Sequence, residues 1–178
     1  MTGMPVRRAA EPLLAALAAL AALGIALVSQ HHFDLQPCPW CVLQRLIFVL
    51  GAGVALLEAA AVIAAQRRVS GAQRRVPLGC QWAAGLRLLL AVAGVAAAAW
   101  QHLVAAAQAS CKLTHADQIL AWTQLDRLVP DLFQPRASCL DAKAWLLGVP
   151  YEFWSGTLFI LLGAAALVSL RVTASLKA

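Results

Sequence analysis

Cysteines are the residues of this chain best suited to chemistry, and two of them form a C-x-x-C pair. Cys38 and Cys41 lie in the stretch PCPWCVLQR. Farther along are Cys80 and then Cys111 and Cys139, the last two with 27 residues between them. A C-x-x-C pair is typical either of thiol–disulfide exchange, in which a thiolate attacks a disulfide, or of half a zinc site. Redox chemistry and metal binding are therefore the two chemistries to weigh.

A zinc site would need ligands beyond one C-x-x-C pair, and histidines are the candidates. The chain contains His31, His32, His102 and His115. They lack the paired spacing of a zinc finger, and the sequence has no second C-x-x-C. We therefore expect no metal site, and we interpret His31 and His32 as solvated or interfacial residues at a helix end.

Arg45 follows Cys41 by four residues, at the start of a long apolar run. If that run is a helix, the guanidinium lies on the same face as the sulfur, one turn deeper. Pro39 suits the first turn, where its missing N–H is not needed, and the helix start stabilises a thiolate. Thiolate and arginine could together bind an anionic or electron-accepting ring that arrives from lipid. The simpler alternative is an arginine that snorkels toward the headgroups.

The composition indicates which elements must position these residues. Of 178 residues, 62% are hydrophobic and 12% are charged, which is typical of an integral membrane protein. A helix of about 20 residues spans roughly 30 Å of hydrocarbon. Four apolar segments are long enough, at about residues 12–30, 43–65, 82–104 and 153–170. We therefore predict an all-α membrane protein, with residues 1–178 forming a single four-transmembrane-helix bundle.

The basic residues predict how this bundle is oriented. Residues 66–76 read QRRVSGAQRRV, with four arginines and no acid, so this loop should lie in the cytoplasm together with both termini. Loops at about 31–41 and 105–152 should then lie outside. The net charge of +6 does not indicate nucleic-acid binding, because the basic residues separate apolar runs. Residues 1–30 could instead be a cleaved secretory signal, but the run is long for one, and we expect a retained helix.

This orientation places four cysteines outside, where disulfides persist, and Cys80 at the cytoplasmic end of the third helix as a small buried hydrophobe. Cys38–Cys41 is the local pair, which leaves Cys111 with Cys139. Both pairs could be structural bridges, and closing the long loop would stabilise the fold by about 3–4 kcal/mol. The small Cys38–Cys41 loop removes little chain entropy and is better suited to chemistry.

The second outer loop also contains a helical pattern. Thr114 can cap a short helix with Asp117 in its first turn, and Pro130 would end it. Apolar residues recur on one face between them, at Ile119, Trp122, Leu125 and Val129. We expect a short amphipathic helix here, which either lies on the outer membrane surface or packs on the bundle.

In combination, these features resemble the disulfide bond formation protein B (DsbB) family, bacterial inner-membrane thiol:quinone oxidoreductases. The resemblance covers roughly residues 30–165. It includes the C-x-x-C pair followed by Arg45, the two separated cysteines of the second outer loop, and LGVPYEFW before the last helix. It implies a multi-pass protein of the bacterial inner (plasma) membrane with both termini in the cytoplasm.

The resemblance also implies a route for electrons. Cys111 and Cys139 would accept them from a periplasmic thioredoxin-like thiol oxidase of the DsbA type, through a transient mixed disulfide at Cys111. The electrons would then pass to Cys38 and Cys41, and from Cys41 to a membrane quinone, which is ubiquinone or menaquinone.

Two further residues receive roles from the resemblance. Arg45 would stabilise the negative charge that develops on the quinone. His102, in WQHL, would correspond to a histidine that the family places close to the quinone. A histidine hydrogen-bonded at the end of a helix is the alternative interpretation.

Two other functions remain open. A vitamin K epoxide reductase-like enzyme is also a quinone-coupled helical bundle, but we would expect a fifth helix or differently placed loop cysteines, and the hydropathy shows neither. A membrane scaffold would have permanent disulfides at all four outer cysteines, which would stay oxidised while a reduced thioredoxin-like protein is supplied.

Overall fold

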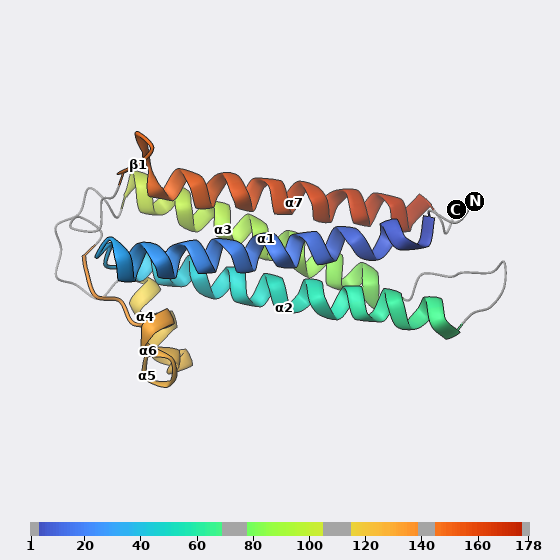
Figure 1. Ribbon diagram of the computed structural model, residues 1–178, viewed down its shortest axis with the longest axis horizontal. Helices are drawn as coiled ribbons and strands as arrows, with labels where there is room; N and C mark the ends of the chain where they lie inside the picture. The colour runs from blue at the N-terminus through green and yellow to red at the C-terminus, as the bar shows by residue number, and fades with distance from the viewer. Residues whose placement is uncertain (1–3, 69–77, 105–114, 139–144, 176–178) are drawn as a thin grey trace.

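The computed structural model describes residues 4–68, 78–104, 115–138 and 145–175. Within these ranges four long helices lie side by side (Figure 1), namely α1 (Met4–His32), α2 (Pro39–Arg68), α3 (Leu78–Leu103) and α7 (Tyr151–Ser175). Each contains an apolar stretch long enough to cross a membrane, at Ala9–His32, Pro39–Arg67, Gly79–Leu103 and Tyr151–Val172. The predicted all-α bundle of four membrane helices is confirmed, and most span ends extend a few residues beyond the predicted ones.

The two ends of the bundle differ. Helix α1 begins and α7 ends at one of them (Figure 1). The other end holds the start of α2 and three short helices, α4 (His115–Thr123), α5 (Leu125–Leu128) and α6 (Pro130–Phe133). We call it the cysteine end, because Cys38 immediately precedes α2. Which side of the membrane this end faces stays a prediction.

Small side chains hold the helices close together. Fully buried positions of the bundle are occupied by alanines such as Ala16, Ala55 and Ala84, whereas Leu57 and Leu89 are more than two-thirds exposed on the outside. A bilayer gives apolar residues no reason to gather inside, so membrane helices associate through the close packing that small residues allow. The large apolar side chains are therefore left to contact lipid.

An ion cluster joins all four long helices inside the bundle. Arg87 of α3 lies between two carboxylates, with Nη1 2.7 Å from Glu58 Oε2 on α2 and Nη2 paired with Glu11 Oε1 on α1. Ser169 of α7 donates its hydroxyl to Glu11 Oε2 at 2.7 Å. Arg87 and Glu58 are each only 5% exposed. Charges so deep in apolar spans are tolerated because they satisfy one another.

The loop helices differ from the single amphipathic helix expected before Pro130. Helix α4 has Asp117 in its first turn, as predicted, but Gln124 adopts a left-handed φ of 54° and ends it before α5. Ile119 and Trp122, two members of the predicted apolar face, are exposed. The expected amphipathic helix is therefore not confirmed. Thr114, the predicted cap, lies outside the described residues.

Other side chains attach this segment to the bundle. Leu120 of α4 and Phe133 of α6 are buried against Val42 and Leu46 of α2. Of the two placements that the sequence left open, the contacts show packing on the bundle. Contact of the exposed Trp122 with lipid stays a prediction.

A small hairpin, which the sequence did not predict, leads into α7. Strand β1 (Trp145–Leu146) pairs antiparallel with β2 (Val149–Pro150). Both turn residues, Leu147 and Gly148, have positive φ, at 54° and 77°. The indole Nε1 of Trp154 donates to the Leu146 carbonyl at 3.2 Å, which fixes the hairpin over the first turns of α7.

Candidate functional site

The C-x-x-C pair forms the first turn of α2. Pro39 begins the helix, and the Cys38 carbonyl accepts the first helical bond, from the Val42 N–H at 3.0 Å. The backbone N–H of Cys41 donates to Cys38 Sγ at 3.3 Å, so this sulfur satisfies one of the donors that a helix start leaves unpaired. The two Sγ atoms lie 2.8 Å apart. A disulfide of about 2.05 Å needs only a small further approach.

The two sulfurs differ in access. Cys38 is fully buried, whereas Cys41 is partly exposed and lines a cavity. The carbonyl of Pro37, one residue earlier, accepts from the backbone N–H groups of Arg136 and Ala137 at 2.9 and 3.3 Å. The segment after α6 thus holds the chain in place just before the pair. Cys41 is the sulfur that a molecule in the cavity would meet.

A line of polar side chains runs from Cys41 across three helices. Gln101 of α3 donates from Nε2 to Cys41 Sγ at 3.3 Å and accepts at Oε1 from Gln44 Nε2 at 2.7 Å. Ser155 of α7 donates to Gln44 Oε1 at 2.5 Å. Both glutamines are buried. Their amides therefore have fixed orientations, and the amide of Gln101 is directed at the Cys41 sulfur.

Sequence reasoning overlooked this polar line, although a signal was present. Gln44, Gln101 and Ser155 all lie within predicted apolar spans, where an unpaired polar group is expensive. That cost predicts that such residues bond to one another. It does not say which helices face each other, so the partners could not be named.

Arg45 is buried deep in the site and does not snorkel. Its Nη1 donates to Gln30 Oε1 at 2.7 Å and to the Leu132 carbonyl at 3.3 Å, and its Nη2 donates to the Ala26 carbonyl at 3.4 Å. Gln30 is held in turn by its bond to the Asp131 carbonyl, at 3.3 Å. All these partners of Arg45 among the described residues are neutral oxygens. Within the described ranges, the positive charge is thus positioned without a carboxylate paired to it.

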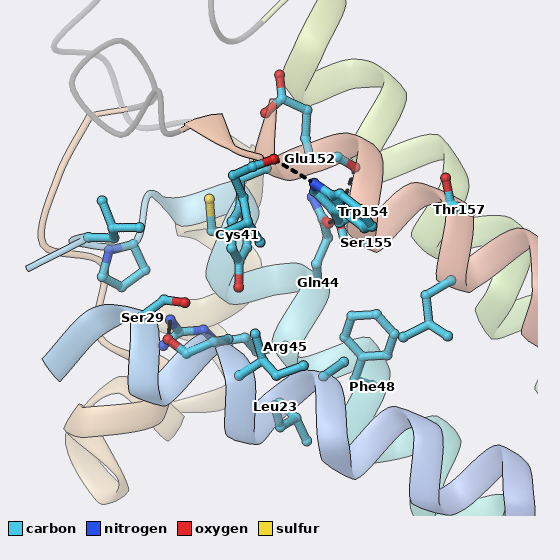
Figure 2. Close-up of a pocket in the computed structure, with 18 of the residues that line it drawn as sticks. Leu23, Ser29, Cys41, Gln44, Arg45, Phe48, Glu152, Trp154, Ser155 and Thr157 are labelled. Atoms are coloured by element: carbon cyan, nitrogen blue, oxygen red, sulfur yellow. Dashed lines mark hydrogen bonds between the residues drawn. The ribbon is translucent and has the colours of Figure 1, made fainter. Parts of the chain in front are cut away.

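A cavity of about 420 Å³ lies between α1, α2 and α7 (Figure 2). Cys41, Gln44 and Arg45 lie along one wall, and most of the remaining lining is apolar. Ile25 of α1 and Leu161 of α7 also line the cavity, and both are more than half exposed. The cavity therefore opens sideways between α1 and α7, where lipid would lie. Its size and lining are typical of a small-molecule site.

His102 lies beside this cavity but does not line it. Its Nδ1 is 2.9 Å from Glu152 Oε1, and its ring meets Phe153 edge-on at 4.7 Å between centroids. Glu152 does line the cavity, so His102 could act on its contents through that carboxylate. Direct contact between His102 and a quinone stays a prediction.

Cys80, His31, His32 and His115 do not line the cavity. Cys111 and Cys139 are outside the described residues. Cys80 is buried near the start of α3, at the end opposite the C-x-x-C pair. Within the described part of the chain, no three His, Cys, Asp or Glu side chains gather as metal ligands would.

Comparison with known proteins decides the family. Residues 8–169 match the family described as "Disulfide bond formation protein DsbB". The chain belongs to the DsbB family. It is 31% identical to a Disulfide bond formation protein B of Cupriavidus metallidurans over 80% of both chains. It is also 31% identical to one of Ralstonia nicotianae, over 89% of this chain and 91% of the relative.

Membership of the DsbB family gives the site a coarse function. The chain is a multi-pass bacterial membrane protein and a disulfide-forming oxidoreductase. A C-x-x-C pair at a helix start, with one sulfur lining a cavity, agrees with thiol chemistry in such a protein.

Proposed function

We propose that this DsbB-family protein reoxidises a periplasmic thioredoxin-like thiol oxidase of the DsbA type and passes the electrons to a membrane quinone. One observation carries the proposal. Cys41 and Arg45 line the same largely apolar cavity, and that cavity opens between two membrane helices, α1 and α7. Ubiquinone and menaquinone are dissolved in the bilayer and could enter through such an opening, whereas a soluble acceptor would arrive from water.

The residues of the cavity fit a quinone. Its head has carbonyl oxygens that accept hydrogen bonds, and Arg45, Gln44 and Gln101 provide N–H donors at the cysteine end of the cavity. Its isoprenoid tail is apolar, as are the remaining walls and the exit between α1 and α7. When bound, the quinone would accept two electrons and two protons as a dithiol becomes a disulfide.

The chain's own residues would have separate roles in the transfer of electrons. Cys41 presents its sulfur to the cavity, while buried Cys38 stays within bonding distance to close the disulfide. Arg45 supplies a fixed positive charge for the negative charge that develops, and no reorganisation is needed because its partners already hold it. Cys111 and Cys139 would receive the electrons from the partner first. A loop pair can reach a soluble protein, and the helix-end pair can reach the lipid phase.

A thiol-trapping experiment in membranes tests the proposal. Reduced thioredoxin-like partner is added with or without oxidised ubiquinone, and free thiols are alkylated at intervals. We expect the four proposed cysteines to become reduced without quinone and to cycle when it is present. If all four stayed oxidised while reduced partner was supplied without quinone, the pairs would be structural and the scaffold function would hold instead.

The proposal also includes the location of the protein. The arginine-rich segment 66–76 supports an inner-membrane orientation with both termini in the cytoplasm and the cysteine end in the periplasm. Only that orientation gives the C-x-x-C pair access to an oxidising compartment.

A further inference from the structure

Two phenylalanine rings are stacked beside the cavity, and one of them is part of its wall. Phe48, three residues beyond Arg45 on α2, lines the cavity and stacks on Phe159 of α7, with centroids 4.1 Å apart and planes 8° from parallel. Both rings are buried. They also line a second, much smaller cavity that reaches Arg87 of the ion cluster. The ring pair therefore separates the space beside Cys41 from the charged centre of the bundle.

Phe159 has its position because residue 94 of α3 is glycine. A Cβ added to Gly94 would lie 2.4–2.5 Å from three consecutive ring atoms of Phe159, Cγ, Cδ1 and Cε1. Nonbonded carbon atoms need about 3.5 Å or more. No side chain at residue 94 is compatible with the ring where it is.

The same distances show on which side of the ring the glycine lies. A point nearly equidistant from three consecutive ring atoms is above a face of the ring, and the parallel stacking places Phe48 on a face as well. One face cannot hold both, so Phe159 is held between Gly94 and Phe48. A methyl group at residue 94 would push Phe159 by about 1 Å toward Phe48, and Phe48 toward the cavity.

We propose that Gly94 is a positioning residue for the electron acceptor and sets the depth of its site. It does not line the cavity but acts through Phe159 on Phe48, whose ring limits how deeply a quinone head can lie. This inference rests on the proposed quinone function. It predicts that added bulk at residue 94 weakens quinone binding without affecting the cysteines.

Gly85 offers a matched control on the same helix. A Cβ there would have no atom within 4 Å beyond its own helix, so Gly85→Ala has the same effect on helix propensity without the push. Gly94→Ala combined with Phe159→Leu is a rescue variant, because removing the ring removes the clash.

The experiment uses the full chain in nanodiscs, with decylubiquinone as acceptor and a reduced thioredoxin-like partner as donor. We expect Gly94→Ala to raise the KM for decylubiquinone at least tenfold, about the effect of one methylene in a binding pocket, with kcat changed less than twofold. Gly85→Ala should keep the wild-type KM. The double variant should recover most of the loss. A purely structural defect would lower kcat through the fraction of active protein and leave KM unchanged.

The outcomes separate this inference from the function on which it rests. If the wild type saturates with decylubiquinone but Gly94→Ala and Gly85→Ala have equal KM values, the positioning role is wrong and the quinone function stands. If the wild type shows no dependence on decylubiquinone, both are wrong. Should Gly94→Ala not fold by itself, a tenfold higher KM in Gly94→Ala stabilised by excess lipid would still support the role, and a wild-type value would overturn it.

Discussion

Each polar side chain around Cys41 has a partner that fixes it. Arg45 is bound by Gln30 and two backbone carbonyls, and Gln101 is bound by Gln44 while it donates to the sulfur. Buried polar groups held in this way form a rigid environment, since each lost bond would leave an unsatisfied group. The chemistry of the sulfur is therefore set by a few named contacts, which can be removed one at a time.

Removing Arg45 should weaken the response to quinone only. Arg45→Ala loses the fixed charge and its hydrogen bonds, and we expect a KM for ubiquinone about ten- to a hundredfold higher, as for other bonds to charged groups. Arg45→Lys keeps the charge but lacks the planar fork of the guanidinium. Its KM for ubiquinone should lie between those of the wild type and Arg45→Ala. Mixed-disulfide formation at Cys111, followed by gel shift, should be normal in both. Unchanged quinone kinetics in Arg45→Ala would refute its role.

Gln101 and His102 are neighbours on α3 that lie differently relative to the cavity. Gln101 contacts Cys41 Sγ, whereas His102 is bound to Glu152 outside the cavity lining. Gln101→Leu should slow reoxidation of the C-x-x-C pair by quinone about tenfold, measured by rapid mixing, because a buried hydrogen bond to the sulfur is lost. His102→Ala should have a smaller effect. A larger effect of His102→Ala than of Gln101→Leu would favour the direct quinone contact predicted for His102.

The cysteine at the opposite end of α3 should be dispensable. Cys80 is buried and lies far along the bundle from the C-x-x-C pair. Cys80→Ala removes one buried sulfur, and we expect oxidase turnover within about twofold of wild type, since small changes of core volume cost little when the site is distant. A large loss of activity in a folded variant would show a role that the structure does not suggest.

Each of the four long helices contributes residues to the site. Helix α2 carries Cys41 and Arg45, whose spacing of four residues was sufficient to predict their shared face. The contributions of α1, α3 and α7 come from residues such as Gln30, Gln101 and Ser155. Periodicity describes one helix at a time, so these inter-helix partners could not be predicted.

Loop elements were harder to predict than spans. Hydropathy predicts spans well because bilayer thickness fixes their length. The second loop follows no such rule: the left-handed Gln124 breaks the expected helix, and Leu147 adopts a positive φ that leucine rarely has. Such local conformations are decided by tertiary contacts, here the packing of Leu120 on α2 and the bond from Trp154 to Leu146.

The ion cluster of Arg87 should dominate the stability of the helix assembly. Arg87→Leu would leave Glu11 and Glu58 buried without their cation, which costs about 3–5 kcal/mol in free energy of unfolding. Glu58→Gln leaves Arg87 paired with Glu11 and should cost less. Unfolding in mixed micelles, followed by circular dichroism, measures both. Equal stabilities of the wild type and Arg87→Leu would show that the cluster contributes nothing.

At the scale of the whole molecule, one end of the bundle faces a different compartment from the other. Helix α1 begins and α7 ends at the same end of the bundle (Figure 1), and in the proposed orientation this end faces the cytoplasm. We expect a green fluorescent protein fused to the C-terminus to fluoresce in cells and an alkaline phosphatase fusion at the same place to be inactive, because these reporters work on opposite sides of the inner membrane. The reverse result would invert the proposed orientation.

The sideways opening between α1 and α7 has a consequence for inhibition. A compound that entered there would compete with the proposed quinone from within the bilayer, so its effective concentration would be its mole fraction in lipid and not its concentration in water. Diluting an assay with extra vesicles should therefore weaken a flat apolar inhibitor even when its total amount is constant. Potencies measured at different lipid contents would be comparable only after correction for partitioning.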